Sequence, residues 1–412
     1  DPFTISKHLA GNTAPFLRLS GAPYWQDRDY PGGSKDRSKM IEMIDMSRLE
    51  RSWYPGEDIE IVSEGDTYPR PRHHCPASFL NLFDGALRSD GRLDGIMHYS
   101  MDYVSSADYE RGYIDSHVRM AEDLDRLYET FSSAETVGLR VYDSMKKIED
   151  ADFSLDPVSP GFVRNQFFTR SVRYTSHNSL PVTFYGSGCA GLLFGESARH
   201  FGPEILKKPL ILDAAAAMIL KKRGIDTGIV SMEKERFRPS YECWKNGEHT
   251  LLCNDYKKVF DDSCAVKLTL DPKAEVLSRF DLPSGLPASY SYENADGQKF
   301  LVFAVNAYVS LPDYYRSYMR QAQIFDFLEK AGSPLPVKTL KHPDLYVVAA
   351  RSVGALHVAL FNCFPDEIFD LDLEVSGCFG SAEFHRAEGT LSGRTVTIRH
   401  LAAFDWCYLT LS

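Results

Sequence analysis

The chain has 412 residues, 43% of them apolar and 25% charged, a balance typical of a folded protein with two or three domains. Its formal net charge of −11 argues against a nucleic-acid binder, because such proteins need a basic surface facing the phosphates. No run of about 18 apolar residues occurs, so the sequence predicts no membrane-spanning helix.

Eight cysteines are scattered along the chain, and none forms a close pair of the metal-binding type. We therefore expect free, mostly buried thiols, a reducing, cytoplasmic compartment, and neither a metal nor a cofactor. The first four residues resemble a remnant of tag removal, no signal peptide is recognisable, and no initiator Met precedes Ile5. We expect the chain to be part of a longer gene product.

Residues 14–133 are predicted to form three strand–helix units. Strands are expected at 16–20, 59–64 and 95–101. The first helix carries Ile41, Ile44 and Leu49 on one face, and the next two are expected at 76–88 and 110–131. A spacing of about forty residues between strands leaves room for parallel crossovers.

Residues 134–232 alternate between strand and helix patterns, which is typical of an α/β domain. The expected strands are 137–142, 180–185 and 210–213. The expected helices are 143–149, a segment beginning at Leu192, and 214–223, which ends at Gly224.

Residues 233–412 are predicted to be mostly strands in a β-sandwich, because short alternating segments are separated by turn signals. The expected strands are 299–305, 345–350, 356–361, 371–375, 395–398 and 405–409. One helix is expected at 313–331. The sequence contains no internal repeat.

Glu64 lies near the carboxyl end of the second predicted strand, just before Gly65. In a barrel of alternating strands and helices, catalytic groups sit at that end. Two interpretations stand: a nucleophile that attacks the anomeric carbon of a sugar, or a carboxylate paired with Arg70 or Arg72. Because side chains alternate along a strand, Glu60 shares this face, where a lone buried carboxylate is costly without a cationic partner or a bulge.

Six other residues near the ends of these strands are candidate substrate contacts: Tyr24, Trp25, Arg18, His73, His98 and Asp102. Aromatic rings can stack on a sugar, and imidazole or carboxylate groups can bind its hydroxyls. The alternatives are core packing for the rings, a surface loop for His73, and capping of the next segment for Asp102. A cation such as Arg18 beside Glu64 would keep that carboxylate ionised, as a nucleophile requires.

A competing constellation surrounds Cys189, which follows a predicted strand in a glycine-rich turn. A strand, a glycine-flanked Cys and a helix together form a nucleophile elbow, and His342 with Asp344 lies downstream. Ser187 stands where the elbow needs a glycine, so the alternative is a buried thiol in a turn. The same turn lacks the glycine spacing of a nucleotide-binding loop.

The order of these parts, and the segments 61–66, 94–99, 210–228 and 356–362, resemble the C-terminal two-thirds of a family-42-like glycoside hydrolase of the β-galactosidase type. The resemblance implies three regions. They are the last three units of a (β/α)8 barrel at 1–133, a flavodoxin/amidotransferase-like α/β domain at 134–340 that drives trimer formation, and an antiparallel β-sandwich at 341–412.

In that family the nucleophile is a Glu at the end of the seventh barrel strand, and the acid/base Glu ends the fourth. The resemblance puts Glu64 in the nucleophile's place and the acid/base outside this chain. Retaining hydrolysis needs both carboxyl groups about 5–5.5 Å apart. We therefore predict that the chain alone is inactive on unactivated glycosides.

Two functions remain open from the sequence. One is a retaining glycoside hydrolase with a carbohydrate substrate. The other is a non-catalytic oligomerisation module of a carbohydrate-active protein. Trimer formation is expected in both, and neither nucleic acid nor membrane is an expected partner.

Overall fold

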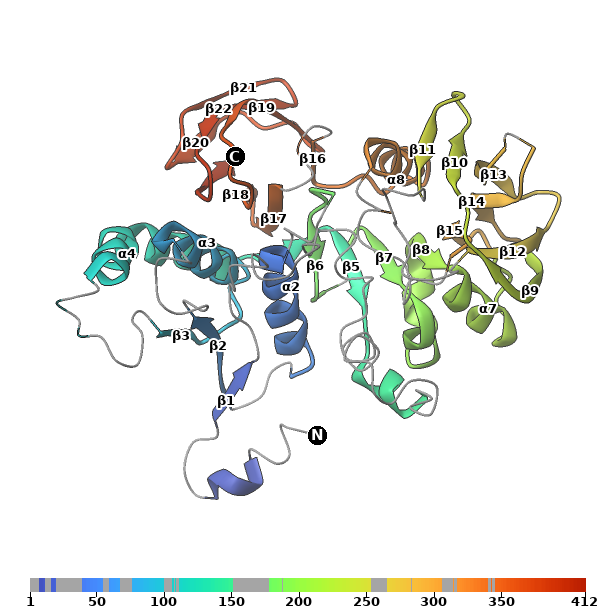
Figure 1. The fold of residues 1–412 in the computed structure, drawn as a ribbon. Coiled ribbons are helices and arrows are strands. Elements are labelled where there is room, and N and C mark those ends of the chain that lie inside the picture. Colours follow the sequence, from blue (N-terminus) through green and yellow to red (C-terminus); the bar gives the residue numbers. More distant parts are fainter. Residues whose placement is uncertain are drawn as a thin grey trace.

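A computed structural model describes residues 7–11, 16–19, 39–54, 59–66, 76–99, 106, 108, 111–150, 178–186, 188–252, 265–282, 284–305, 314, 317–339, 342 and 345–412. These residues form a mixed α/β structure with several sheets (Figure 1). No helix in these ranges is long and apolar enough to cross a bilayer.

The N-terminal region is a parallel sheet in the order β1-β2-β3, covered by helices on one face. Its elements are β1 (Phe16–Leu19), α2 (Lys39–Ser52), β2 (Glu60–Asp66), α3 (Ala77–Arg88), β3 (Gly95–Tyr99) and α4 (Arg111–Ser132). The three predicted strand–helix units are confirmed, with boundaries that differ by a few residues.

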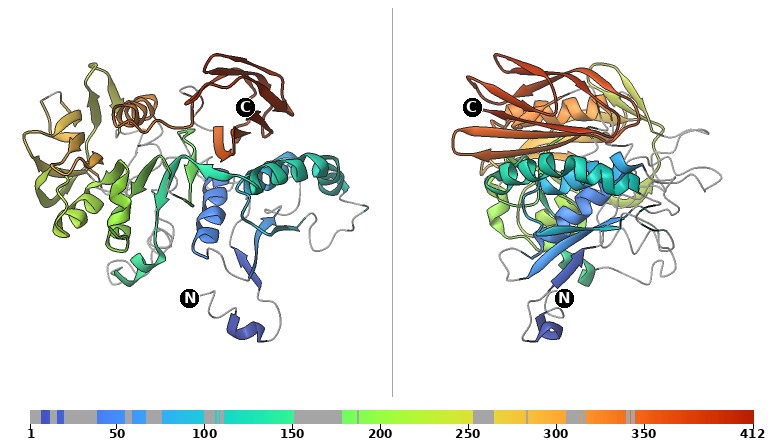
Figure 2. Two further views of the ribbon diagram at one scale, coloured as in Figure 1. Left: turned by 180° about the vertical axis from the view of Figure 1, so that it is seen from behind. Right: turned by 90° about the vertical axis from the view of Figure 1, so that its left-hand side faces the viewer.

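Helix α3 lies between this sheet and the C-terminal strands (Figure 2), and nine of its twelve residues are buried. Its apolar side chains share one core with strands near the C-terminus, including Phe361 and Trp406. Gly85 allows this close packing, because a Cβ there would lie 3.2 Å from both rings. The side chains of Phe79, Leu82 and Phe83 are 5% exposed or less.

A single strand was expected over 137–142, but the structure has two strands that belong to different sheets. β4 (Glu135–Val137) pairs with β17 (Leu345–Ser352), and β5 (Leu139–Tyr142) pairs with β7 (Ala190–Leu193). The chain passes from one sheet to the other at Gly138, whose φ is +141°. A Cβ there would lie 2.2 Å from the Pro181 carbonyl oxygen. Only glycine fits this backbone.

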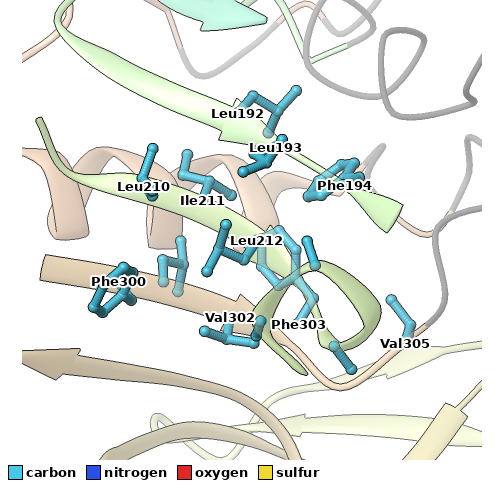
Figure 3. Packing of buried hydrophobic residues seen from close by; sticks show 14 of the residues in the cluster. Leu192, Leu193, Phe194, Leu210, Ile211, Leu212, Phe300, Val302, Phe303 and Val305 are labelled. Carbon is cyan, nitrogen blue, oxygen red and sulfur yellow. The ribbon is translucent and has the colours of Figure 1, made fainter. Parts of the chain in front are cut away.

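The central region is a nine-stranded sheet in the order β11-β10-β13-β14-β15-β8-β7-β5-β6. The run from β15 to β6 is parallel and the run from β15 to β11 is antiparallel. Its further strands are β6 (Val182–Thr183), β8 (Leu210–Asp213), β10 (Tyr241–Trp244), β11 (His249–Leu251), β13 (Glu275–Phe280), β14 (Pro287–Glu293) and β15 (Lys299–Phe303). Leucine, isoleucine and phenylalanine side chains of β7, β8 and β15 pack its core (Figure 3).

Three predictions for this region are wrong. The strand expected at 299–305 pairs in parallel with β8 and not with sandwich strands. The segment from Leu192 continues strand β7 instead of starting a helix, and the expected helix at 143–149 is the 3-10 helix η2 (Met145–Asp150). The remaining elements are η3 (Gly195–Arg199), η4 (Pro203–Lys207), α7 (Ala214–Lys222), α8 (Tyr318–Lys330) and the pair β9 (Ile229–Phe237) and β12 (Ala265–Leu270).

The C-terminal strands form two antiparallel sheets, in the orders β16-β19-β22-β21 and β20-β23-β18-β17-β4, that enclose a core of their own. The strands are β16 (Val337–Lys338), β18 (Ala355–Asn362), β19 (Ile368–Val375), β20 (Ala382–His385), β21 (Gly389–Ser392), β22 (Thr395–Leu401) and β23 (Trp406–Leu411). The alternation seen in the sequence is confirmed in β19, where buried and exposed side chains largely alternate.

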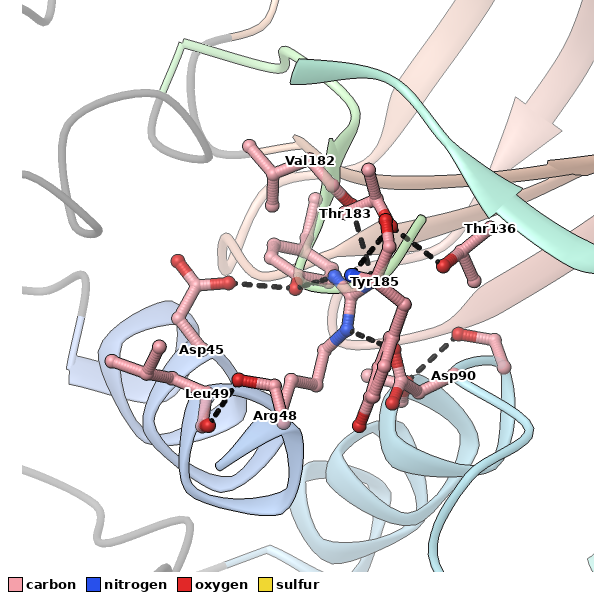
Figure 4. Close-up of polar contacts among 12 residues, drawn as sticks. Asp45, Arg48, Leu49, Asp90, Thr136, Val182, Thr183 and Tyr185 are labelled. Atoms are coloured by element: carbon pink, nitrogen blue, oxygen red, sulfur yellow. Dashed lines mark hydrogen bonds and ion pairs between the residues drawn. The ribbon is translucent and has the colours of Figure 1, made fainter. Parts of the chain in front are cut away.

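A buried polar junction joins the three regions around Arg48 of α2 (Figure 4). Its Nε donates to Asp90 Oδ1 (2.7 Å), Nη1 to the Tyr346 hydroxyl (2.6 Å) and Nη2 to the Val182 carbonyl (3.1 Å). Tyr346 in turn donates to Asp45 Oδ1 (2.8 Å). These partners belong to α2, to the turn after α3, to β6 and to β17, so one side chain links the parallel sheet to both other regions.

Candidate active site

Strand β2 is the middle strand of the parallel sheet, and its two faces have different surroundings. Ser63 bonds to Ser47 of α2 (2.9 Å between hydroxyl oxygens), and Ile61 is fully buried. A Cβ at Gly65 would meet the side chains of Ile96 and Leu80. The odd-numbered positions of β2 therefore face the helices.

Glu64 lies between these positions, so its side chain projects from the face opposite α2 and α3. It pairs with Met97 of β3, whose side chain is 37% exposed. The strand is continuous through this point, since β2 pairs in register with both neighbours. The carboxylate is thus carried two residues before the end of a rigid, parallel strand, and is itself partly exposed.

Glu60 was expected to lie deep inside a barrel and to need a cationic partner or a bulge. The structure places its side chain on the surface of the described part of the chain, and no register shift occurs along β2. Val62, between the two glutamates on the same face, is buried.

The other predicted contacts are only partly described. Arg18 pairs with Val62 through the backbone, on the strand next to Glu64, and its side chain lies outside the described residues. The predicted contacts Tyr24, Trp25, His73 and Asp102 also lie outside the described residues.

His98 does not share a face with Glu64. It points toward α3 and α4, where its Nε2 lies 3.2 Å from Asp84 Oδ2 and its ring lies 4.6 Å from that of His117. It is two positions after Ile96 on β3, so the two side chains share a face, and Ile96 packs in the same layer. The structure therefore brings His98 together with Asp84 and His117, two residues that the sequence did not single out.

The elbow proposed around Cys189 is wrong, because the residues after it form strand β7 and no α-helix follows. The thiol donates to the Gly138 carbonyl (3.1 Å), and burial raises its pKa to about 11. A nucleophilic cysteine needs the opposite shift. Cys189 is a structural thiol beside Gly138, where the chain passes between the two sheets.

Comparison with protein-family models gives no match, and comparison with curated proteins gives none. Among solved structures, the chain is similar to a catalytic mutant of a GH42 β-galactosidase from G. stearothermophilus, with a TM-score of 0.59 and 10% identity over 100% of this chain and 61% of that one. It is similar to a β-galactosidase from Bacillus circulans sp. alkalophilus, with a TM-score of 0.58 and 11% identity over 95% of this chain and 60% of that one.

An α-L-fucosidase, isoenzyme 2 from Paenibacillus thiaminolyticus, gives a TM-score of 0.58 and 11% identity over 98% of this chain and 66% of that one. The chain thus shares its fold with glycoside hydrolases and spans about three fifths of the length of the two β-galactosidases. The resemblance inferred from the sequence is confirmed at the level of the fold.

Proposed function

We propose that the chain is the nucleophile-bearing portion of a retaining, β-galactosidase-like glycoside hydrolase, with Glu64 as the nucleophile. The observation that carries the proposal is the position of Glu64. It stands near the carboxyl end of the middle parallel strand, on the face opposite the helices. In barrel enzymes that position faces the substrate.

In this proposal β1, β2 and β3 are strands six, seven and eight of a (β/α)8 barrel that other residues complete. Residues 134–340 form the amidotransferase-like trimerisation domain and residues 341–412 the β-sandwich. Supporting evidence is the fold shared with about 60% of the β-galactosidase chains. The acid/base carboxyl belongs to the part of the barrel that this chain does not contain.

Hydrolysis of aryl glycosides tests the proposal. Retaining hydrolysis of an alkyl glycoside needs a second carboxyl group to protonate the leaving oxygen, whereas a dinitrophenyl group leaves without a proton. We expect the chain to release dinitrophenol from a β-galactoside or an α-L-fucoside and to leave the matching methyl glycosides intact. Glu64→Gln should abolish that release.

Glu60→Gln is the matched control, because it removes a carboxylate from the same face of the same strand. Release that persists in Glu64→Gln would refute the assigned nucleophile. Hydrolysis of the methyl glycosides that is lost in Glu64→Gln would confirm the residue but show that this chain contains the acid as well.

The second candidate is a non-catalytic assembly module of a carbohydrate-active protein. It is favoured by the parallel sheet, which has three strands in the described part of the chain and so falls short of the eight of a closed barrel. This candidate predicts a trimer in light scattering and no glycosyl transfer to Glu64 from any activated glycoside.

A further inference from the structure

Asp84, His98 and His117 meet at one point between α3, β3 and α4, on the sheet face opposite Glu64. One ligand atom from each residue lies within 4.8 Å of the other two. Asp84 Oδ2 is 3.2 Å from His98 Nε2 and 3.6 Å from His117 Nδ1. Each residue comes from a different element, so the grouping is a product of the tertiary fold.

The polar atoms of this cluster lack the partners that buried groups normally have. Asp84 Oδ2 and His117 Nδ1 are buried and make no hydrogen bond within the described residues, and the Asp84 side chain is completely buried. Buried polar atoms are nearly always satisfied, so two unsatisfied ligand atoms in one cluster need an explanation. A bound cation between the carboxylate and the imidazoles would supply it.

The distances agree with a zinc-type site. Zinc bonds of about 2.0–2.1 Å to nitrogen and oxygen give a tetrahedron whose edges are about 3.3 Å. The two separations between the carboxylate oxygen and the imidazole nitrogens, 3.2 and 3.6 Å, are close to that edge. Histidine nitrogen with one carboxylate oxygen is a common ligand set for this metal.

Arg88 is a charged residue next to the cluster, and it orients the Asp84 carboxylate. Arg88 Nε donates to Asp84 Oδ1 (2.8 Å), which fixes the carboxylate and leaves Oδ2 directed at the imidazoles. Arg88 itself is balanced by Asp125, 3.1 Å away. An outer hydrogen bond of this kind is the usual support of a metal-binding carboxylate.

We propose that Asp84, His98 and His117 bind a divalent transition metal of the zinc class, which ties α3 and α4 to β3. Three protein ligands leave a fourth position for water. The His98 and His117 side chains are 15% and 34% exposed, so the metal can enter from the histidine side. This site is independent of Glu64 and of the hydrolase proposal.

Cobalt titration of the full chain tests the site after dialysis against a chelator. We expect one equivalent of Co²⁺ to bind with the visible absorption of four-coordinate cobalt, and Zn²⁺ to displace it. His117→Ala should weaken binding at least about 100-fold, because loss of even an outer-shell partner costs about 10- to 100-fold. His400→Ala is the control, because His400 is exposed on β22, far from the cluster in sequence.

Circular dichroism establishes whether each variant is folded. If His117→Ala does not fold, His98→Gln takes its place. Zn²⁺ should also raise the melting temperature of the wild type but not that of the folded variant, since a ligand of the folded state stabilises it. The proposal is overturned if no stoichiometric cobalt spectrum forms, or if His117→Ala and His98→Gln bind as tightly as the wild type. Either result leaves an Asp–His ion pair without a metal.

Discussion

The junction around Arg48 makes a quantitative prediction about how the regions of the chain are held together. Arg48→Met keeps much of the hydrocarbon stem and removes the charged guanidinium group, which lies over the rings of Phe184 and Tyr346. Arg48 and Asp90 are both completely buried. Removing one partner of such a pair leaves a buried charge uncompensated, which costs about 3–5 kcal/mol.

The local electrostatics agree with a loss of this size. Burial would lower the pKa of Arg48, but Tyr346, Asp90 and Asp45 raise it above its ordinary value, so the guanidinium is held in its charged form. Arg48→Met removes the hydrogen-bond donor of Asp90 and of the Tyr346 hydroxyl, and it removes the positive charge near Asp45. We therefore expect a loss of about 4 kcal/mol in the free energy of unfolding.

Urea unfolding followed by tryptophan fluorescence measures this loss. Arg399→Met is the control, because the pair of Arg399 with Glu388 (3.2 Å) is exposed and should contribute about 0–1 kcal/mol. The double variant Arg48→Met/Asp90→Asn should lose less than the sum of its single variants, because Asp90→Asn neutralises the orphaned charge. Additive losses, or an Arg48→Met variant as stable as Arg399→Met, would refute the reasoning.

Three further predictions concern other parts of the fold. Burial lowers the pKa of His357, so below about pH 6.5 this residue binds more protons in the unfolded chain than in the folded one. The free energy of unfolding, measured by urea titrations across pH, should therefore decline as the pH falls below about 6.5, and less steeply in His357→Gln. Gly138→Ala should cost about 2–3 kcal/mol, because its Cβ meets the Pro181 carbonyl, whereas Gly354→Ala, in a turn with open space, measures the backbone strain alone. Iodoacetamide at pH 7.5 should label the exposed Cys378 well before Cys189, whose pKa is about 11. Mass spectrometry of the digest detects the order of labelling, and faster labelling of Cys189 would contradict its assignment as a structural thiol.

Local signals were sufficient to predict many of the elements. Helix α3 has a wide apolar face, and this periodicity predicted a helix packed on the core. Gly224, with a φ of +89°, ends α7 as the sequence indicated. Strand β19 was recognisable from its alternation.

The failures have identifiable physical causes. Periodicity cannot separate a short buried strand from a helix, so the apolar run at Leu192 was assigned to the wrong element. The sheet that β15 joins depends on β8, which lies far away in the sequence and forms the parallel pair that completes the core. Gly138 was read as part of one strand, because a positive φ has no sequence signature beyond the glycine itself.

The two polar clusters were invisible in the sequence for a related reason. Arg48 is 42 residues from Asp90 and 298 from Tyr346. Asp84, His98 and His117 have no metal-binding spacing and meet only after α3 and α4 pack on the sheet. Glu64 could be singled out because the predicted strand ends just before Gly65, although β2 continues to Asp66. Its role as nucleophile stays a prediction.

Covalent trapping of Glu64 tests the central claim most directly. The chain is incubated with dinitrophenyl fluoroglycosides of β-galactose and α-L-fucose, which form a glycosyl-enzyme that hydrolyses slowly, and the adduct is located by peptide mass spectrometry. We predict one fluoroglycosyl group on the peptide that contains Glu64, present in Glu60→Gln and absent in Glu64→Gln. An adduct on another carboxylate, or no adduct with either sugar, would contradict the account.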